Sequence, residues 1–252
     1  MPKRLGRNRT QALVERLGQD VVSGAYAGSK GFPIEAQLCK QLGASRSILR
    51  EAVKMLTAKG LLGARPRHGT WVRPEEEWNL LDPDVLRWLL DRKFSLTLLA
   101  EFTEVRLAIE PTAAQIAAYS ATPATIAPIR HAIDRMRAAK AGKDDPLDSD
   151  IAFHVAVLKA TGNRFFAQLE ELIDTALRIS IRLTNRTKGV ALGDVTAHEK
   201  VLDAIAAHKA DQARALMEEL LSEVMDLINE AKSSSALPRT SERKATGTKA
   251  RR

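Results

Sequence analysis

Apolar residues recur along this chain at the three- and four-residue spacing of amphipathic helices, and that spacing predicts a mostly α-helical protein. The pattern is clearest in the first third of the chain, where two helices follow each other closely. The second of them has its apolar positions at Leu49, Ala52, Val53 and Leu56. The first has them at Ile34, Leu38 and Leu42. Each helix therefore has one face suited to a small core and another suited to solvent.

The segment between these two helices fits a tight turn. Gly43 can adopt the left-handed backbone conformation that such a turn needs, and Ser45 is a favourable N-cap for the second helix. Gly60 follows the last turn of that helix, where a glycine commonly ends it. A helix, a short glycine-containing turn and another helix make a helix-turn-helix.

The polar face of the second helix is basic. Arg46, Arg50 and Lys54 recur every four residues, opposite its apolar side. Two short extended runs follow, and they flank a tip made of Arg65-Pro66-Arg67-His68-Gly69. A hairpin with such a tip can approach a phosphate backbone or a minor groove. The alternative is a solvated charge stripe on an ordinary helix, but the turn, cap, basic helix and basic hairpin in this order favour DNA binding.

Residues from about 13 to 73 resemble the winged helix-turn-helix of the GntR family of bacterial transcription regulators. The resemblance rests on Phe32-Pro33-Ile34-Glu35, Leu42-Gly43-Ala44-Ser45-Arg46, Leu49-Arg50-Glu51-Ala52-Val53, Gly60-Leu61 and Gly69-Thr70-Trp71-Val72. It implies that the start of the basic helix meets the major groove or its phosphates, with His68 and Gly69 at the wing tip. The expected DNA contacts are Ser45, Arg46, Ser47, Arg50, Lys54, Arg65, Arg67, His68 and Gly69. The family often has an arginine where this chain has Ala36, so one common contact is absent and a different operator preference is expected.

Beyond Val72 the chain has no convincing strand pattern, and the expected helices cover residues 83–92, 95–119, 123–140, 145–161, 164–187, 194–208 and 211–231. Pro111 should kink the second of these or mark a break. The predicted fold class is mostly α. It combines an N-terminal winged helix-turn-helix, with a small β-hairpin wing, and an all-α helical bundle.

Charge divides the chain at the same place. Residues 1–73 contain 14 Lys and Arg against 4 Asp and Glu, a net charge of +10, whereas residues 74–231 have −8 and residues 232–252 have +6. The sign changes at Pro74, so we expect a DNA-binding domain at 1–73, a linker at 74–82, a helical effector-binding and dimerisation domain at 83–231, and a basic disordered tail at 232–252. The nucleic-acid surface is thereby confined to the N-terminal module, with the tail as a possible aid.

Composition adds three expectations. Hydrophobic residues make up 44% of the chain but aromatic residues only 4%, which favours a core of aliphatic side chains on helices. The single cysteine, Cys39, cannot form an internal disulfide, which fits a reducing cytoplasm. The chain shows neither an apolar run of the ~18–20 residues that a membrane helix needs nor a signal peptide, so we expect a cytoplasmic protein without a membrane partner.

The acidic helical part resembles the FCD effector domain of the FadR subfamily within the GntR family. The motifs are Glu104-Val105-Arg106 with Ile109-Glu110-Pro111, Asp150 with Phe153-His154, Thr161-Gly162-Asn163, and His198-Glu199-Lys200 with Ala204-Ile205. A further segment, from Trp78-Asn79-Leu80-Leu81-Asp82-Pro83-Asp84-Val85-Leu86 to Trp88, resembles the linker and first effector helix of the galactonate-responsive, DgoR-like group. These resemblances imply an effector that is galactonate or another sugar acid.

Three ionisable residues are expected on inward faces of two of these helices. Asp150 and His154 lie one turn apart on or beside an apolar stripe, and His198 lies on the apolar face of a later helix. Burying them without partners is unfavourable, and a divalent ion such as zinc or nickel would satisfy all three. A buried Asp–His hydrogen bond without metal is the alternative, and the spacing alone favours it. The FCD resemblance favours the metal.

The chain departs from that resemblance at one position. Many metal-binding FCD domains supply a third histidine from the final helix, where this sequence has Leu220, which cannot bind a metal. The expectation is a three-ligand site with open positions, which the carboxylate and hydroxyl oxygens of a hydroxy acid could complete. The openness should weaken metal affinity.

Arg106 is the expected anion clamp, because a guanidinium matches a carboxylate with two parallel hydrogen bonds. An ion pair with Glu110, one turn along a solvated face, is the alternative. Arg178 and Arg182 form another pair four residues apart. They lie either on a solvent-exposed helix face or in the effector-binding pocket. Asn163 is expected to cap a helix. The expected effector-binding residues are Arg106, Asp150, His154, Arg178, Arg182 and His198.

The leading functional hypothesis is a ligand-responsive transcription repressor that binds a palindromic double-stranded DNA operator as a homodimer and is released by a small carboxylate effector. A metal-dependent enzyme is one alternative, because an open Asp/His/His site can support hydrolysis. No catalytic base or nucleophile is readable near those motifs, so we do not expect an enzyme. A non-specific architectural DNA-binding protein is the other alternative, and the acidic middle of the chain argues against it.

Overall fold

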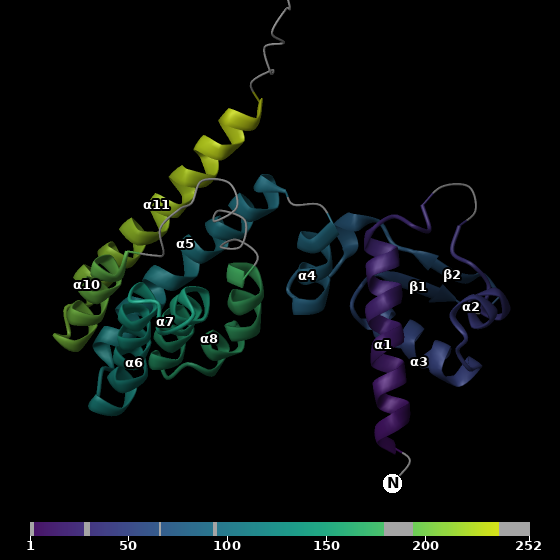
Figure 1. Ribbon diagram of the computed structural model, residues 1–252, viewed down its shortest axis with the longest axis horizontal. Helices are drawn as coiled ribbons and strands as arrows, with labels where there is room; N and C mark the ends of the chain where they lie inside the picture. The colour runs from purple at the N-terminus through teal and green to yellow at the C-terminus, as the bar shows by residue number, and fades with distance from the viewer. Residues whose placement is uncertain (1–2, 28–30, 66, 93–94, 179–193, 237–252) are drawn as a thin grey trace, which may run out of the picture.

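The computed structural model describes residues 3–27, 31–65, 67–92, 95–178 and 194–236. They form an N-terminal module and a larger helical domain, with one short helix between them (Figure 1). The N-terminal module contains α1 (Lys3–Val22), α2 (Glu35–Leu42) and α3 (Arg46–Ala58). Two antiparallel strands, β1 (Leu62–Arg65) and β2 (Gly69–Val72), complete it. The mostly α fold with a two-stranded wing is as the sequence predicts.

α3 begins and ends where its sequence indicates. The Ser45 hydroxyl accepts a hydrogen bond from the Ile48 backbone N–H at 3.4 Å, and Gly60 follows the last turn with a φ of +80°. Leu49 is 1% exposed, and Ala52 and Leu56 are fully buried. The predicted apolar face of this helix is therefore confirmed.

The preceding helix is shorter than its apolar pattern suggests. Ile34 has an extended backbone just before α2, and it is 66% exposed rather than part of the buried face. The Gln37 side chain accepts a hydrogen bond from the Ile34 N–H, which fixes this residue outside the first turn. Leu38, at 1% exposure, anchors α2 in the core. The expectation that Ile34 faces the core is wrong.

The short helix α4 (Pro83–Arg92), which follows the turn η1 (Glu75–Glu77), packs against α1 of the N-terminal module. Trp88 is 1% exposed in the same core cluster as Leu17 of α1. Glu15 accepts hydrogen bonds from both terminal nitrogens of Arg87, at 2.8 and 2.7 Å, and from the Trp88 indole at 2.9 Å. The Lys59 ammonium, one residue past α3, donates to the carboxylates that begin α4. α4, which begins the segment predicted as the effector domain, is therefore held to α1 and α3 by both packing and charge.

Gly18 permits the close approach of α1 and α4, and replacing it with alanine is expected to destabilise the N-terminal module. A Cβ at this position would lie 2.3 Å from the Trp88 ring, so the two helices would have to separate. Such overpacking destabilises by ~1–3 kcal/mol, although alanine otherwise favours a helix over glycine by about 1 kcal/mol. Urea unfolding followed by tryptophan fluorescence would measure the change. Gln11→Ala, at an exposed position of α1, is the control. A Gly18→Ala midpoint equal to that of the wild type would contradict the packing.

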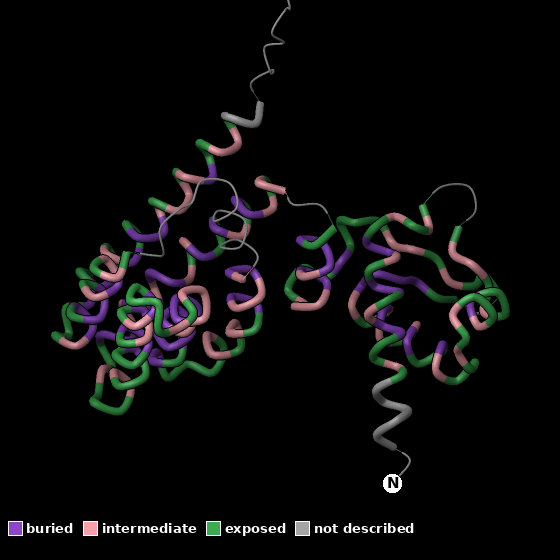
Figure 2. The backbone as a smooth tube through the Cα atoms, in the orientation of Figure 1, coloured by how far each residue is buried: buried purple, intermediate pink, exposed green. Residues whose placement is uncertain are grey.

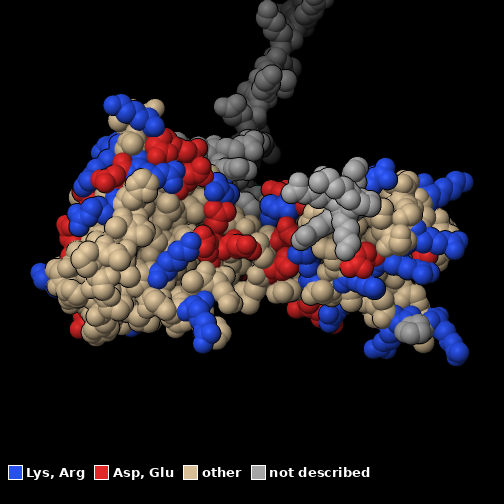
Figure 3. Space-filling model, turned by 90° about the horizontal axis from the view of Figure 1, so that it is seen from below, with Lys and Arg blue, Asp and Glu red and all other residues tan. Residues whose placement is uncertain are grey.

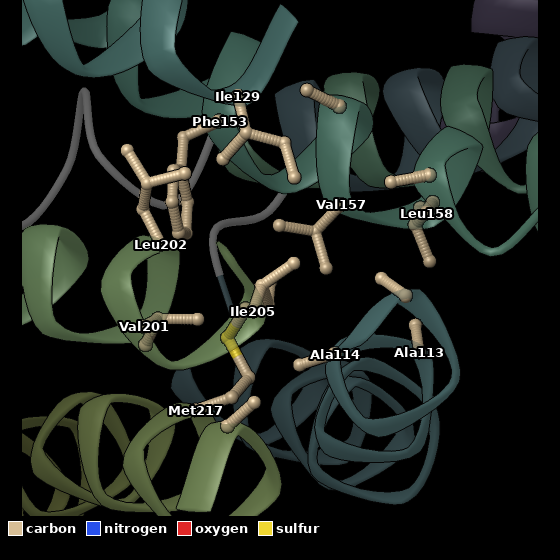
Figure 4. Packing of buried hydrophobic residues seen from close by; sticks show 14 of the residues in the cluster. Ala113, Ala114, Ile129, Phe153, Val157, Leu158, Val201, Leu202, Ile205 and Met217 are labelled. Carbon is tan, nitrogen blue, oxygen red and sulfur yellow. The ribbon is translucent and has the colours of Figure 1, made fainter. Parts of the chain in front are cut away.

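The helical domain contains α5 (Leu96–Tyr119), α6 (Pro123–Lys140), α7 (Pro146–Ala160), α8 (Arg164–Gln168), α10 (Val195–Ala206) and α11 (Ala210–Ala236). Residues 170–178 are also helical. The two longest helices, α5 and α11, pack along each other (Figure 1). The buried residues lie on the helix faces turned towards the middle of the bundle (Figure 2). Phe153 and Val157 of α7 there meet Leu202 and Ile205 of α10 (Figure 4).

Three helical boundaries differ from the sequence prediction. α5 continues through Pro111 without a break, and that proline is buried. The helix expected at 164–187 is interrupted at Leu169 and resumes for residues 170–178, and its remainder lies outside the described residues. α11 reaches Ala236, so residues 232–236 are helical rather than disordered, because a long helix already packed on α5 can propagate beyond its last buried turn. Residues 237–252 lie outside the described part.

Within that part of the chain, no helix is both long enough and apolar enough to cross a membrane.

Candidate DNA-reading surface and buried effector site

The basic face of α3 is open to solvent. All five predicted contacts at the start and along this helix are exposed: Ser45, Arg46, Ser47, Arg50 and Lys54. Lysine and arginine side chains gather on the N-terminal module, whereas acidic ones are fewer there (Figure 3). The helix can therefore approach a polyanion with its cations outward and its apolar face still buried.

Glu35, at the start of α2, binds Arg50, the middle one of the three basic residues on this face. Its carboxylate accepts a hydrogen bond from the Arg50 Nε at 2.8 Å and lies 3.9 Å from the Arg46 Nε. The hydrogen bond from Arg50 lowers the pKa of Glu35, so this carboxyl stays ionised beside the reading helix. Arg50 is thus oriented before DNA arrives, and sequence reasoning did not identify Glu35 as its partner.

The wing presents its predicted residues at an exposed tip. Arg65, Arg67, His68 and Gly69 are all exposed. The guanidinium of Arg65 lies 5.7 Å from the centroid of the Trp71 ring, which orients it by a cation–π contact. Arg67 and Gly69 both have positive φ angles, of 66° and 81°, so the chain reverses tightly here. The structure thus places the predicted wing contacts on one hairpin.

The helical domain brings three of the predicted effector residues into one buried cluster. Asp150 and His154 come from α7 and His198 from α10, and their exposed fractions are 8%, 2% and 2%. One ligand atom from each lies within 4.8 Å of the others. Arg106 reaches the same cluster from α5 and is 3% exposed. The prediction that the Asp and both His face inward is confirmed.

His154 has a fixed orientation. Its Nδ1 lies 2.5 Å from the Glu110 carboxylate, so in the neutral ring this nitrogen carries the proton and donates it to Glu110. The lone pair is then on Nε2, which lies 3.2 Å from the Arg106 Nη2 and 3.9 Å from the Asp150 Oδ2. A carboxylate that orients a histidine in this way is common behind metal-binding histidines.

His198 has the same arrangement with a backbone partner. Its Nδ1 donates to the Asp194 carbonyl oxygen at 2.8 Å, which leaves the Nε2 lone pair facing inward. That Nε2 has no hydrogen-bond donor among the described residues, and it lies 3.2 Å from the Asp150 Oδ1. A carboxylate and two imidazole lone pairs converge, a set of acceptors that fits a divalent cation.

Glu110 is the site residue that sequence reasoning missed. It is 1% exposed and binds the Arg106 Nε at 2.6 Å, so the expected alternative of an ion pair on a solvated face is wrong. Burial would raise the pKa of Glu110, but Arg106 and His154 outweigh it and lower that pKa to about 2. The spacing of four residues indicated a pair with Arg106, but nothing in the sequence placed the pair inside the bundle.

The remaining predicted effector residues lie elsewhere. Arg178 binds Asp148 and Asp174 and lines a cavity of about 840 Å³ against the opposite side of α7, where Ile151 and Val155 point. None of the residues of the buried cluster lines this cavity. Arg182 lies outside the described residues.

The sequence analysis also made predictions for Leu220 and Asn163. Leu220 is 8% exposed and packs in the main core, so α11 offers an apolar side chain at the position expected for a third histidine. Asn163 caps α8, because its side-chain oxygen accepts a hydrogen bond from the Phe165 N–H at 2.9 Å. The predicted capping role of Asn163 is confirmed.

Comparisons with known proteins identify both parts of the chain. Residues 9–72 match the model of bacterial regulatory proteins of the gntR family, and residues 101–223 match the FCD domain. The galactonate operon transcriptional repressor of Escherichia coli strain K12 is 33% identical, over 82% of this chain and 90% of that protein. A putative L-lactate dehydrogenase operon regulatory protein of the same strain is 31% identical, over 86% and 83%.

Among solved structures, Lar, which controls the expression of the Listeria monocytogenes agr system, has a TM-score of 0.57 at 16% identity. The match covers 90% of this chain and 97% of that chain, and it supports the fold. The curated relatives are transcription regulators and not enzymes. GntR regulators bind DNA operators, which agrees with the basic α3 and wing. The chain is a transcription regulator that belongs to the GntR family and has an FCD domain as its C-terminal part.

Proposed function

We propose that this regulator is a repressor that leaves its operator when a small hydroxy acid, galactonate or a related sugar acid, binds the buried cluster of α5, α7 and α10. The observation that carries the proposal is the unpaired Nε2 of His198, which faces the Asp150 carboxylate inside the bundle. The name of the 33%-identical relative, a galactonate operon repressor, supports the choice of ligand class.

In this proposal Asp150, His154 and His198 hold a divalent cation such as zinc. Glu110 and the Asp194 carbonyl fix the two imidazoles in the tautomer that presents Nε2. The ion supplies a positive centre that the oxygen atoms of a hydroxy acid can bind. With Leu220 in the final helix, three protein ligands leave coordination positions for those oxygens.

Arg106 is the proposed carboxylate clamp. In the ligand-free arrangement its guanidinium is shared between Glu110, at 2.6 Å from Nε, and His154, at 3.2 Å from Nη2. Nη1 has no hydrogen-bond partner among the described residues and can donate to a ligand carboxylate while Nε stays bound to Glu110. Binding would therefore draw α5 and α7 towards one ligand, and a movement of α5 can reach α4, the helix that precedes it.

The DNA side of the proposal is a homodimer on a palindromic operator. Two reading heads related by a two-fold axis bind two half-sites, and a ligand that changes their spacing lowers operator affinity. Such coupling between an effector and an operator typically amounts to ~1–3 kcal/mol. The alternative of a metal-dependent enzyme has no support from the relatives, which are regulators.

Metal analysis tests the cation site. Protein purified without chelators is expected to retain a divalent metal, and His154→Ala is expected to retain less than ~10% of it because one of three protein ligands is lost. Elemental analysis by mass spectrometry gives the metal per chain. His131→Ala is the matched control, because His131 lines the other cavity and should leave the metal unchanged. Equal, near-zero metal in the wild type and His154→Ala would contradict the cation site.

A thermal-shift screen tests the ligand. A panel of sugar acids with and without added zinc should raise the melting temperature of the wild type in the presence of metal, and the active acid should also release operator DNA. His154→Ala should lose the shift and His131→Ala should keep it. If no hydroxy acid of the panel stabilises metal-loaded protein, the ligand class is wrong.

A further inference from the structure

An exposed isoleucine stands at the start of α2, where a helix normally has a polar residue. Ile34 occupies the N-cap position, with an extended backbone at φ −69° and ψ 156°. The Gln37 side chain accepts a hydrogen bond from the Ile34 N–H at 3.3 Å, which is one half of a capping box. The other half is missing, because the Ile34 side chain has no oxygen to accept a hydrogen bond from the first turn.

Isoleucine is unfavourable at this position for two reasons. A serine, threonine, aspartate or asparagine at the N-cap would shift the folding equilibrium towards the native state ~5-fold. The Ile34 side chain also gains little from burial, because it is 66% exposed. Single exposed apolar side chains are common on proteins, but this one stands where a polar residue would stabilise the fold. A position that breaks a local rule of stability is typical of a functional surface.

Ile34 lies next to the reading face of α3. The following residue, Glu35, accepts the hydrogen bond from the Arg50 Nε at 2.8 Å and lies 3.9 Å from the Arg46 Nε. Ala36, on the other side of Glu35, is exposed as well. Two exposed apolar residues therefore flank the acidic partner of the reading cations. In a helix-turn-helix the first helix crosses the DNA backbone while the second lies in the major groove, so the start of α2 comes to the edge of that groove.

We propose that Ile34 contacts the C5-methyl group of a thymine in the operator, and so adds to sequence reading an apolar contact that the cations of α3 do not make. Thymine presents a methyl group in the major groove, and apolar side chains recognise it there, whereas arginine and lysine read the acceptor atoms of guanine. The contact also buries the apolar surface that Ile34 exposes in the free protein. The proposal concerns operator reading alone and does not depend on the effector or the metal.

Uracil substitution tests the contact one methyl group at a time. The full chain first selects its operator from a random duplex library, and each thymine of that operator is then replaced by deoxyuridine, which lacks only the methyl group. At the contacted thymine the wild type is expected to bind ~4-fold more weakly, since burial of a methyl-sized group changes an equilibrium by about that factor. Ile34→Ser should bind both duplexes equally, because it has no apolar contact to lose. Fluorescence anisotropy gives the four affinities.

The serine variant also separates DNA reading from folding. Serine can complete the capping box with Gln37, so the melting temperature of Ile34→Ser should rise by ~2–4 °C, and its lost uracil effect cannot come from unfolding. Ile34→Val retains most of the apolar side chain and should retain the uracil effect. Leu81→Ser is the matched control, because Leu81 is 70% exposed and lies outside the helix-turn-helix. It should change neither the operator affinity nor the uracil effect.

Two results would overturn the thymine contact. The first is a wild type that binds every uracil-substituted operator as tightly as the thymine operator, which would leave Ile34 at most a contact to the sugar–phosphate backbone. The second is a uracil effect of equal size in the wild type and Ile34→Ser, because another residue would then contact the methyl group. Either result leaves the proposed repressor intact, since release by an effector is measured separately.

Discussion

Arg50→Ala is expected to abolish specific operator binding while leaving the effector domain unchanged. The side chain projects from the exposed face of α3, oriented by the hydrogen bond from its Nε to Glu35. Its terminal nitrogens are free to donate together to guanine or to a phosphate. Loss of one such contact weakens binding ~10-fold or more per half-site, hence ~100-fold or more for a dimer on two half-sites.

Gel-shift titration against the operator, repeated with a random duplex and at two salt concentrations, would measure this loss. The ratio of specific to random affinity should fall for Arg50→Ala, because a base contact is lost and not merely a charge. Arg130→Ala is the control, since it removes the same charge from an exposed position of α6 in the acidic domain. An operator affinity that Arg50→Ala leaves unchanged refutes the assignment of α3 as the reading helix.

Lys54→Ala at the far end of the same face should behave differently. Its ammonium lies 3.6 Å from the neighbouring Glu51 carboxylate and has no bidentate geometry, so it suits a phosphate as a point charge. Loss of a phosphate contact weakens specific and random binding alike. It also lowers the salt dependence of binding by about one ion. The two variants together thus separate reading of bases from attraction to the backbone.

The reading helix was predictable because all of its determinants lie within one short stretch. The cap at Ser45, the apolar face of Leu49 and Leu56, and the stop at Gly60 are local, and helix geometry converts them directly into two faces. The end of α8 was not predictable for the converse reason. Leu169 is neither glycine nor proline, and the interruption there has no local signal in the sequence.

The buried cluster was only half predictable. The apolar stripes of α7 and α10 point Asp150, His154 and His198 inward, and any helical packing of those stripes brings them into one interior. Glu110 differs, because its contact with His154 joins residues 44 positions apart on two helices. With Arg106 four positions before it, Glu110 has the spacing of an ordinary surface ion pair. The surroundings of α5, with α11 on one side and α7 on another, are what bury this pair.

Burial makes Glu110 the residue whose loss should most reduce stability. Glu110→Ala leaves the Arg106 guanidinium, 3% exposed, without its carboxylate, and it removes the acceptor of the His154 Nδ1 proton. Removing one partner of a buried ion pair typically destabilises by about 3–5 kcal/mol. Urea unfolding followed by circular dichroism would measure the change. Glu104→Ala, at an exposed position of the same helix, should stay close to the wild type.

Replacing both partners by apolar residues separates the structural and functional roles of the pair. In Arg106→Met with Glu110→Leu neither charge of the pair is left without its partner, so the double variant should recover part of the stability that Glu110→Ala loses, although the His154 Nδ1 proton still has no acceptor. Without the guanidinium it should nevertheless fail to respond to a carboxylate effector, and operator binding should become constitutive. A double variant that is stable and still released by the effector would show that Arg106 is a structural residue. The carboxylate would then have to be bound by the metal alone.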